Sequence, residues 1–182
     1  MSRTRHRTIE MRESPAASDD WTLRTLIDGL SNRGEAPALI AVKGETVRPL
    51  ACAALAERVR SLASGLLRLG IVPGEPVALL APNGPDWVVA RLGLGAVGAV
   101  AVALDDLATE AEHRSALADS GCRRALTSAA HVSMLRSIDP QLELTVVSDG
   151  STPNGTRSWT ELFAAPAESL PSLPSQAPAM LV

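Results

Sequence analysis

The chain has 182 residues, 46% of them hydrophobic and 20% charged, which is enough apolar material for the core of one domain, or of one and a part. The formal net charge is 17 − 20 = −3 and aromatic residues make up only 2%, which argues against a nucleic-acid partner. The longest apolar run, residues 96–104, is too short for an integral membrane segment, and residues 1–20 contain no apolar stretch of a secretory signal. We therefore expect a cytoplasmic protein.

The N-terminal third of the chain predicts a tail, a weak helix, a hairpin and a strong helix, in that order. Residues 1–20 are basic and polar, which is typical of a mobile tail, with an arm for nucleic acid or an acidic membrane as the alternative. A weak helix over residues 21–30 and a short hairpin over residues 38–47 follow. The strong helix comes after Pro49 and ends at Gly70, which enters a left-handed conformation at little cost. Its apolar residues recur at helical spacing, at Leu55, Val59, Leu62, Leu66 and Leu69.

From residue 77 onward, predicted strands alternate with predicted helices. The strands cover residues 77–80, 97–104, 123–127 and 142–147. We expect Asn83 to cap a helix that has Pro85 in its first turn, Thr109 and Glu112 to form a capping box, and Ser128 to cap a third helix. Parallel neighbours need a crossover helix between them, so this alternation predicts an α/β fold with a mainly parallel sheet and flanking helices.

The last part of the chain changes character. A short capped helix is predicted over residues 158–163, with Ser158 and Glu161 as its box. Four prolines then mark residues 166–178 as an irregular connector, and residues 179–182 have the apolar composition of a buried strand. We therefore divide the chain into a tail at 1–20, an α/β lobe at 21–165, and a proline-rich connector with the start of a truncated strand at 166–182.

One glycine motif resembles a nucleotide-binding fingerprint but has the wrong context. Gly93, Gly95 and Gly98 spell G-x-G-x-x-G. In a dinucleotide-binding fold these glycines leave a strand and open a helix, so that a pyrophosphate lies on the helix N-terminus. Here they close a predicted helix and lead into a strand. We interpret them as a helix stop with close helix–sheet packing.

Few other residues suggest chemistry, and the sequence itself assigns no catalytic, cofactor-binding or metal-binding residue. Asp105 and Asp106 follow a strand, where α/β proteins place functional groups, but we interpret them as a turn that leads into the next helix. His113 and His131 are expected to be exposed surface histidines rather than catalytic bases. The two cysteines are Cys52 and Cys122, and we expect both to be reduced. They do not form a zinc-binding motif with the histidines.

The order of several short segments resembles the N-terminal part of the adenylate-forming enzymes, the AMP-binding ligases that include the acyl-CoA synthetases. The resemblance extends over residues 22–182. The segments that carry it are L-G-I-V-P-G-E-P-V-A at 69–78, P-N-G-P-D-W-V-V-A at 82–90, the glycine-rich stretch 93–104 and D-S-G-C-R at 119–123. The sequence departs from the family at Pro49-Leu50-Ala51, where Thr-Tyr often precedes the first helix, and at Ala103, where the family has proline.

The resemblance implies the fold of the N-terminal lobe of acyl-CoA synthetases and, for a complete enzyme, a ligase reaction. Such an enzyme would adenylate a carboxylic acid with ATP and Mg²⁺, then transfer the acyl group to CoA or to a carrier-protein phosphopantetheine. Trp87 favours a fatty-acid or other acyl-CoA ligase, with an adenylation domain of a peptide synthetase as the next choice. The family's phosphate loop and later motifs do not occur in these 182 residues, so no catalytic position is carried over.

The chain by itself is therefore expected to be an inactive fragment that binds no cofactor. A hypothesis from another class is a non-catalytic interaction module or half of a split enzyme. Its partner would be the missing C-terminal part or a full-length paralogue, docked on the apolar residues 179–182. Either way, we expect the isolated lobe to expose apolar surface and to associate.

Overall fold

The computed structural model describes residues 22–43, 46–147, 152–163, 169–173 and 180–181. The predicted tail, the hairpin tip and most of the proline-rich connector lie outside the described residues. None of the helices in these ranges combines the length and the apolar composition that a membrane crossing requires.

The N-terminal elements follow the predicted order. Helix α1 covers Leu23–Asn32 and begins with a capping box between Thr22 and Thr25. Strands β1 (Pro37–Lys43) and β2 (Thr46–Ala51) form an antiparallel hairpin, and α2 covers Cys52–Arg68. The predicted apolar stripe of α2 is buried from Leu55 to Leu66, and Gly70 follows the helix with φ of 78°. These observations confirm the hairpin, the strong helix and its glycine stop.

The core of the molecule is a six-stranded sheet in the order β7-β6-β5-β3-β4-β8, and all its neighbours are parallel. Its strands are β3 (Pro76–Leu80), β4 (Val100–Ala103), β5 (Arg124–Thr127), β6 (Glu143–Val146), β7 (Arg157–Ser158) and β8 (Met180–Leu181). This confirms the predicted α/β class. Strand β4 is shorter than the predicted 97–104, because Val97 caps α3 and Gly98 turns the chain with φ of 78°.

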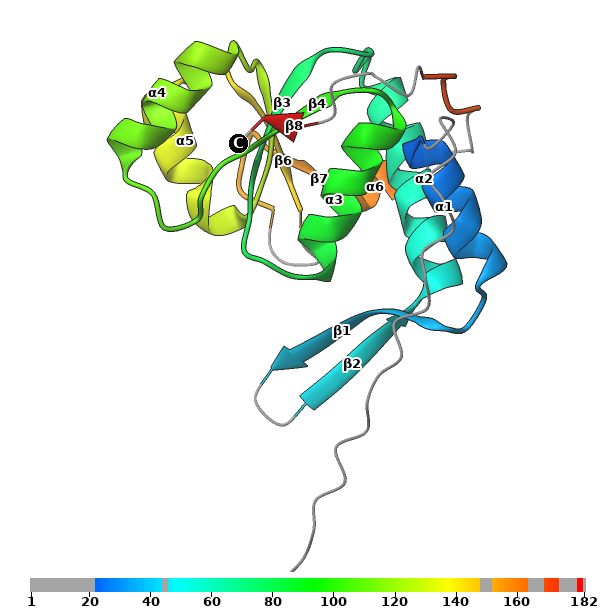
Figure 1. The fold of residues 1–182 in the computed structure, drawn as a ribbon. Helices are drawn as coiled ribbons and strands as arrows, with labels where there is room; N and C mark the ends of the chain where they lie inside the picture. Colours follow the sequence, from blue (N-terminus) through cyan, green and yellow to red (C-terminus); the bar gives the residue numbers. More distant parts are fainter. Residues whose placement is uncertain (1–21, 44–45, 148–151, 164–168, 174–179, 182) are drawn as a thin grey trace, which may run out of the picture.

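Helices cover both faces of the sheet (Figure 1). On one face lie α2, α3 (Pro85–Ala96) and α6 (Trp159–Phe163), with α1 packed outside them. On the other lie α4 (Glu110–Ser120) and α5 (Val132–Ile138), the latter preceded by the 3₁₀ turn η1 (Ala129–His131). Strand β3 serves both faces, since Val77 and Leu79 enter one core and Ala78 and Leu80 the other. Burial on both faces explains why the strands are apolar throughout rather than alternating.

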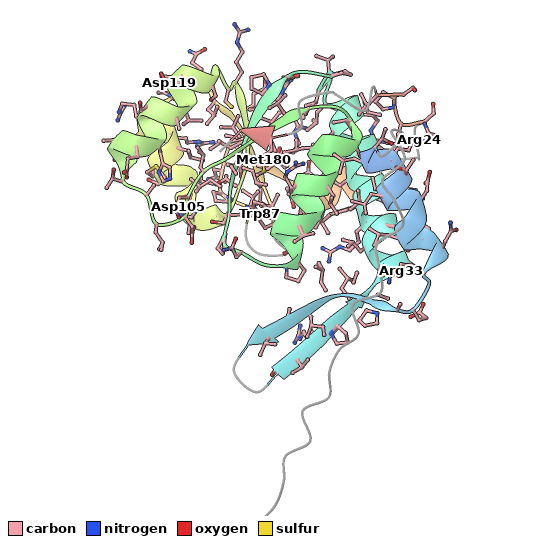
Figure 2. All side chains as sticks on the ribbon, viewed as in Figure 1. Arg24, Arg33, Trp87, Asp105, Asp119 and Met180 are labelled. Atoms are coloured by element: carbon pink, nitrogen blue, oxygen red, sulfur yellow. The ribbon has the colours of Figure 1, made fainter. Side chains whose placement is uncertain are left out.

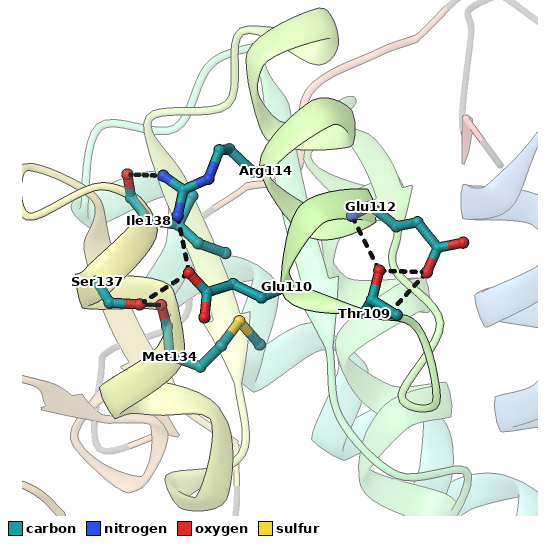
Figure 3. Close-up of polar contacts among 7 residues, drawn as sticks. All are labelled: Thr109, Glu110, Glu112, Arg114, Met134, Ser137 and Ile138. Carbon is teal, nitrogen blue, oxygen red and sulfur yellow. Dashed lines mark hydrogen bonds and ion pairs between the residues drawn. The ribbon is translucent and has the colours of Figure 1, made fainter.

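Of the three caps predicted for the helices between residues 83 and 138, two differ in the structure. Gly84, not Asn83, occupies the N-cap of α3, because Pro85 takes the first helical position, which its missing N–H and fixed φ suit. Ser128 makes no side-chain capping bond; its hydroxyl contacts the ring of His131 instead. The third prediction is confirmed, since Thr109 and Glu112 form a complete capping box at α4 (Figure 3).

The glycine motif has the structural role predicted for it. Gly93 and Gly95 lie in the last turns of α3, where an added Cβ would meet side-chain atoms of Leu62 and Leu23, respectively. Gly98 makes the left-handed turn into β4. The three glycines therefore close a helix, as the sequence indicated, but Gly93 and Gly95 pack closely against helices α2 and α1 rather than against the sheet.

Candidate functional site

Ligands of open parallel sheets bind beyond the carboxyl ends of the strands, at the point where the strand order reverses. Here β3 lies between β4 and β5, so the chain passes from β3 to its neighbour on one side and then returns to the other. The segments that follow β3, β4 and β5 meet at this edge, so a ligand-binding site is expected there.

Four polar side chains from two of these segments lie together. Asp105 and Asp106 follow β4, while Ser128 and His131 follow β5. The Nε2 atom of His131 lies 3.1 Å from Oδ1 of Asp106, and its Nδ1 lies 2.8 Å from Oγ of Ser128. A carboxylate can only accept a hydrogen bond, so in the tautomer with the proton on Nε2 that N–H faces Asp106 and Nδ1 accepts from the Ser128 hydroxyl.

Ser128, His131 and Asp106 are the residue types of a serine hydrolase catalytic triad, but they are not arranged as one. In that triad Nε2 serves the serine and Nδ1 the carboxylate, whereas here the two nitrogens are exchanged. In addition, Ser128 and His131 are only three residues apart, so their contact is one within a single turn. We therefore interpret these contacts as a tie that holds the segment after β4 against the start of η1.

Asp105 and His113 complete this edge, and both act on the main chain. Asp105 lies in the segment that follows β4 (Figure 2). Its carboxylate accepts the Leu107 N–H at 3.0 Å, and its carbonyl accepts the Ala108 N–H at 3.1 Å, which is the predicted turn. Nε2 of His113 lies 2.9 Å from the Asp105 carbonyl oxygen. The His113 ring therefore contacts the main chain of the turn at Asp105 and does not face solvent.

The predicted exposure of the two histidines was wrong. His113 is only 3% exposed, because it shares the sheet-facing side of α4 with Leu117, one turn later. The side chain of His131 is 19% exposed. Charged residues lie on nearly every side of α4, and the helix has no clear apolar stripe. Its sequence therefore does not indicate which face is buried. Burial here is decided by the sheet against which the helix packs.

A second polar cluster lies at the opposite, amino-terminal edge of the sheet. Arg124 at the start of β5 pairs with Glu75 and, through Nε at 3.1 Å, with Glu143 at the start of β6. Next to it opens a cavity of about 340 Å³ that Thr145 and Arg157 help to line. The charges of Arg124 are thus already matched by carboxylates of neighbouring segments, which indicates a structural tie across three strands.

A second cavity, of about 500 Å³, lies between the β1–β2 hairpin and the starts of α2 and α3. Arg58 and Asp86 line it and pair at 3.0 Å. The Arg58 guanidinium also lies over the rings of Trp159 and Phe163, 5.6 and 5.9 Å from their centroids. Both its charge and its flat face are therefore engaged within the fold.

Two features of the described residues bear on ATP and on a metal ion. The glycine motif closes α3 instead of opening a helix, so it presents no helix N-terminus to a phosphate. Within the described ranges, no three or more His, Cys, Asp or Glu side chains are grouped closely enough to hold a metal ion. Both cysteines are buried free thiols, and burial raises the pKa of Cys122, although a hydrogen bond from Ser120 opposes this.

Comparison with known proteins gives a consistent picture. The model of the family described as AMP-binding enzyme matches residues 29–181. A 4-coumarate–CoA ligase of Narcissus pseudonarcissus is 28% identical over 133 residues, which is 72% of this chain and 24% of that protein. The chain thus spans about a quarter of the length of the curated relatives it matches.

Solved structures share the fold. An acyl-CoA synthetase of Brucella canis superimposes with a TM-score of 0.68 at 24% identity, covering 76% of this chain and 26% of that one. A benzoate–CoA ligase of Burkholderia xenovorans gives the same score and identity, covering 84% of this chain and 30% of that one. The parallel sheet and its helices are therefore an architecture found in much longer enzymes.

Proposed function

Because the chain belongs to the AMP-binding enzyme family, we propose that it is the N-terminal α/β lobe of an AMP-forming acid–thiol ligase. The observation that carries the proposal is the family match, which spans nearly all of the chain, from residue 29 to residue 181. The lobe would occupy residues 21–165, between the tail and the proline-rich connector, in a cytoplasmic enzyme.

The complete ligase would activate a carboxylic acid by joining it to AMP. The carboxylate oxygen attacks the α-phosphorus of ATP, pyrophosphate leaves, and the acyl-adenylate then gives its acyl group to a thiol. The activation works because AMP is a far better leaving group than hydroxide. Coenzyme A is the proposed thiol, since the relatives at 27–29% identity are named as CoA ligases. Because these relatives are named for 4-coumarate, aromatic acids should be tested as substrates together with fatty acids.

We propose that this polypeptide does not adenylate by itself. Two observations support this. The glycine motif closes α3 instead of opening a helix, so it supplies no phosphate cradle, and the Ser/Thr/Gly-rich phosphate loop of the family has no counterpart in the sequence. ATP and Mg²⁺ would then be bound by segments that the longer relatives carry in addition.

The test begins with the nucleotide sequence of the source locus beyond codon 182. We expect an open frame, continuous or resumed after a shift, that encodes a Ser/Thr/Gly-rich loop ending in lysine. The joined product should catalyse carboxylate-dependent exchange of pyrophosphate into ATP with 4-coumarate, benzoate or a long-chain fatty acid. The 182-residue chain should give no exchange and no heat of Mg-ATP binding in calorimetry. Tight Mg-ATP binding by this chain alone would contradict the proposal.

One observation supports a second candidate, half of a split ligase or a non-catalytic interaction module. Among the described strands, β8 pairs with β4 alone and lies at the end of the sheet, and Met180 is 39% exposed. An open strand edge is a template for pairing with another chain. If a true stop codon is followed by a separate frame that starts with the phosphate loop, mixing the two purified polypeptides should restore exchange.

A further inference from the structure

Arg91 on α3 carries a positive charge that no carboxylate of the described residues matches. Its Nε donates to Sδ of Met180 at 3.1 Å, and a thioether sulfur is only a weak acceptor. Its Nη1 is buried and has no hydrogen-bond partner, a state that no other arginine shows within the described part of the chain. Arg91 therefore lacks the anionic partner that a buried guanidinium usually has.

The missing partner makes this position costly. A guanidinium stays charged in proteins, so it cannot avoid the cost of burial by losing its proton. Burial lowers the pKa of Arg91, because the charged form is less well solvated on α3 than in water. A carboxylate beside the guanidinium would offset this cost and accept hydrogen bonds from its free N–H groups.

The first turn of α1 lies next to Arg91. A Cβ added at Gly95, one turn after Arg91 on α3, would overlap Cδ1 of Leu23 and would lie 3.1 Å from Nη1 of Arg91. Leu23 is the first residue of α1. The chain therefore enters α1 close to the unpartnered nitrogen.

The residues just before α1 are acidic. Asp19 and Asp20 precede Leu23 by four and three residues, which an extended chain covers in about 10–14 Å. Both lie outside the described residues. The length of chain before α1 is thus short enough for a carboxylate at either position to reach the Arg91 guanidinium.

Other segments near Arg91 fit the missing charge less well. Residues 174–179, which lead into Met180, contain no charged side chain. Glu10 and Glu13 are ten or more residues from the start of α1, so holding them at Arg91 would order a longer stretch of chain at a greater cost in conformational entropy.

We propose that the carboxylates of Asp19 and Asp20 bind the Arg91 guanidinium and so tie the chain before α1 to α3, beside strand β8. The tie consists of charge-assisted hydrogen bonds and should weaken as the salt concentration rises. It involves residues of this chain alone, so it stands or falls independently of the ligase assignment.

A double-mutant cycle on the full 182-residue chain tests the tie, with urea denaturation as the measurement. Asp19→Asn with Asp20→Asn should raise the unfolding equilibrium constant about three- to tenfold, because the Arg91 charge is partly buried. In the background of Arg91→Met, the same two changes should have no effect. Glu10→Gln with Glu13→Gln removes the same charge and is the matched control, which should have no effect in either background.

The Arg91 side chain supplies a second measurement that needs no change at Arg91 itself. In ¹H–¹⁵N NMR spectra, its Nε–H signal should shift when Asp19 and Asp20 are replaced by asparagine and should stay in place in the glutamate control. Far-UV circular dichroism confirms that each variant is folded. The absence of coupling in the cycle, an Nε–H signal that does not respond to the aspartate changes, or coupling to the glutamates instead would each overturn the proposal.

Discussion

Gly65 shows how much a single atom matters where two helices touch. It lies in α2, directly against α6, and an added Cβ would come within 2.7 Å of the main-chain oxygen of Leu162. Backbone cannot move aside as a flexible side chain can. Gly65 is therefore required by close approach of α2 and α6, whereas the other helical glycine of interest, Gly29 in α1, has nothing within 4 Å of its added Cβ.

We accordingly predict opposite effects for two glycine-to-alanine changes. Gly65→Ala should lower the free energy of unfolding by about 1–3 kcal/mol through overpacking. Gly29→Ala should leave it unchanged or raise it by up to about 1 kcal/mol, because alanine is the better helix former. Urea denaturation followed by far-UV circular dichroism measures both. Equal losses for the two variants would show that the α2–α6 contact is not the cause.

At the scale of the element, α4 is held by its ends and edges more than by an apolar stripe. Thr109 Oγ1 accepts the Glu112 N–H, and the Glu112 carboxylate accepts the Thr109 N–H at 2.7 Å (Figure 3). On the side facing α5, Arg114 donates to Glu110 at 2.7 Å and to the Ile138 carbonyl at 3.4 Å. These contacts give a charged helix a fixed start and a fixed neighbour.

The capping box predicts a dependence of stability on pH. The hydrogen bond from the Thr109 N–H lowers the pKa of Glu112, and a second bond from the Thr109 hydroxyl adds to this. A carboxyl whose pKa is lower in the folded state stabilises the fold above its unfolded pKa, and this contribution is lost as the pH falls through the folded pKa. Glu112→Gln should therefore lower stability at neutral pH but hardly at strongly acidic pH.

Thr109→Ala removes the other half of the box and should lower the free energy of unfolding by about 0.5–2 kcal/mol. Thermal unfolding at a series of pH values measures both variants. Ser115→Ala, on the exposed side of the same helix, is the matched control and should have little effect at any pH. A pH profile for Glu112→Gln that parallels that of the unmodified chain would contradict the assignment.

At the scale of the whole molecule, one core joins segments far apart in the sequence. Ile27 of α1, Leu62 of α2, Leu79 of β3 and Trp159 of α6 belong to the same buried cluster. Trp159 is fully buried, stacks edge-on against Phe163 and receives Arg58 over its ring. The late segment that contains α6 is therefore part of the fold and not an appendage.

Trp159→Ala should lower the free energy of unfolding by about 3–5 kcal/mol, since it leaves a large cavity in this shared core. Trp87→Ala, at a half-buried position on α3, should have a smaller effect. Denaturant unfolding followed by circular dichroism compares the two. If α6 instead unfolds separately, denaturant unfolding of the unmodified chain will show two steps. Trp159→Ala will then remove only the first step, the unfolding of α6.

The sequence by itself determined the order and type of most elements, because their signals are local. The stripe of α2, the box at Thr109, the stop at Gly70 and the apolar strands all depend on neighbours within a few residues. The same holds for the reversed glycine motif, which required only the order of helix and strand. The ligase family was likewise accessible, since its segments keep their order along the chain.

Only the tertiary structure decided which polar residues meet and which faces are covered. His113 is buried by the sheet beneath α4, and His131 lies against Asp106 of the segment that follows β4. The apolar residues Ile40, Val42 and Val47 look in the sequence like those of any short strand, yet their side chains stay exposed in the described structure. Burial and contact depend on segments tens of residues apart, and no local pattern in the chain encodes those distances.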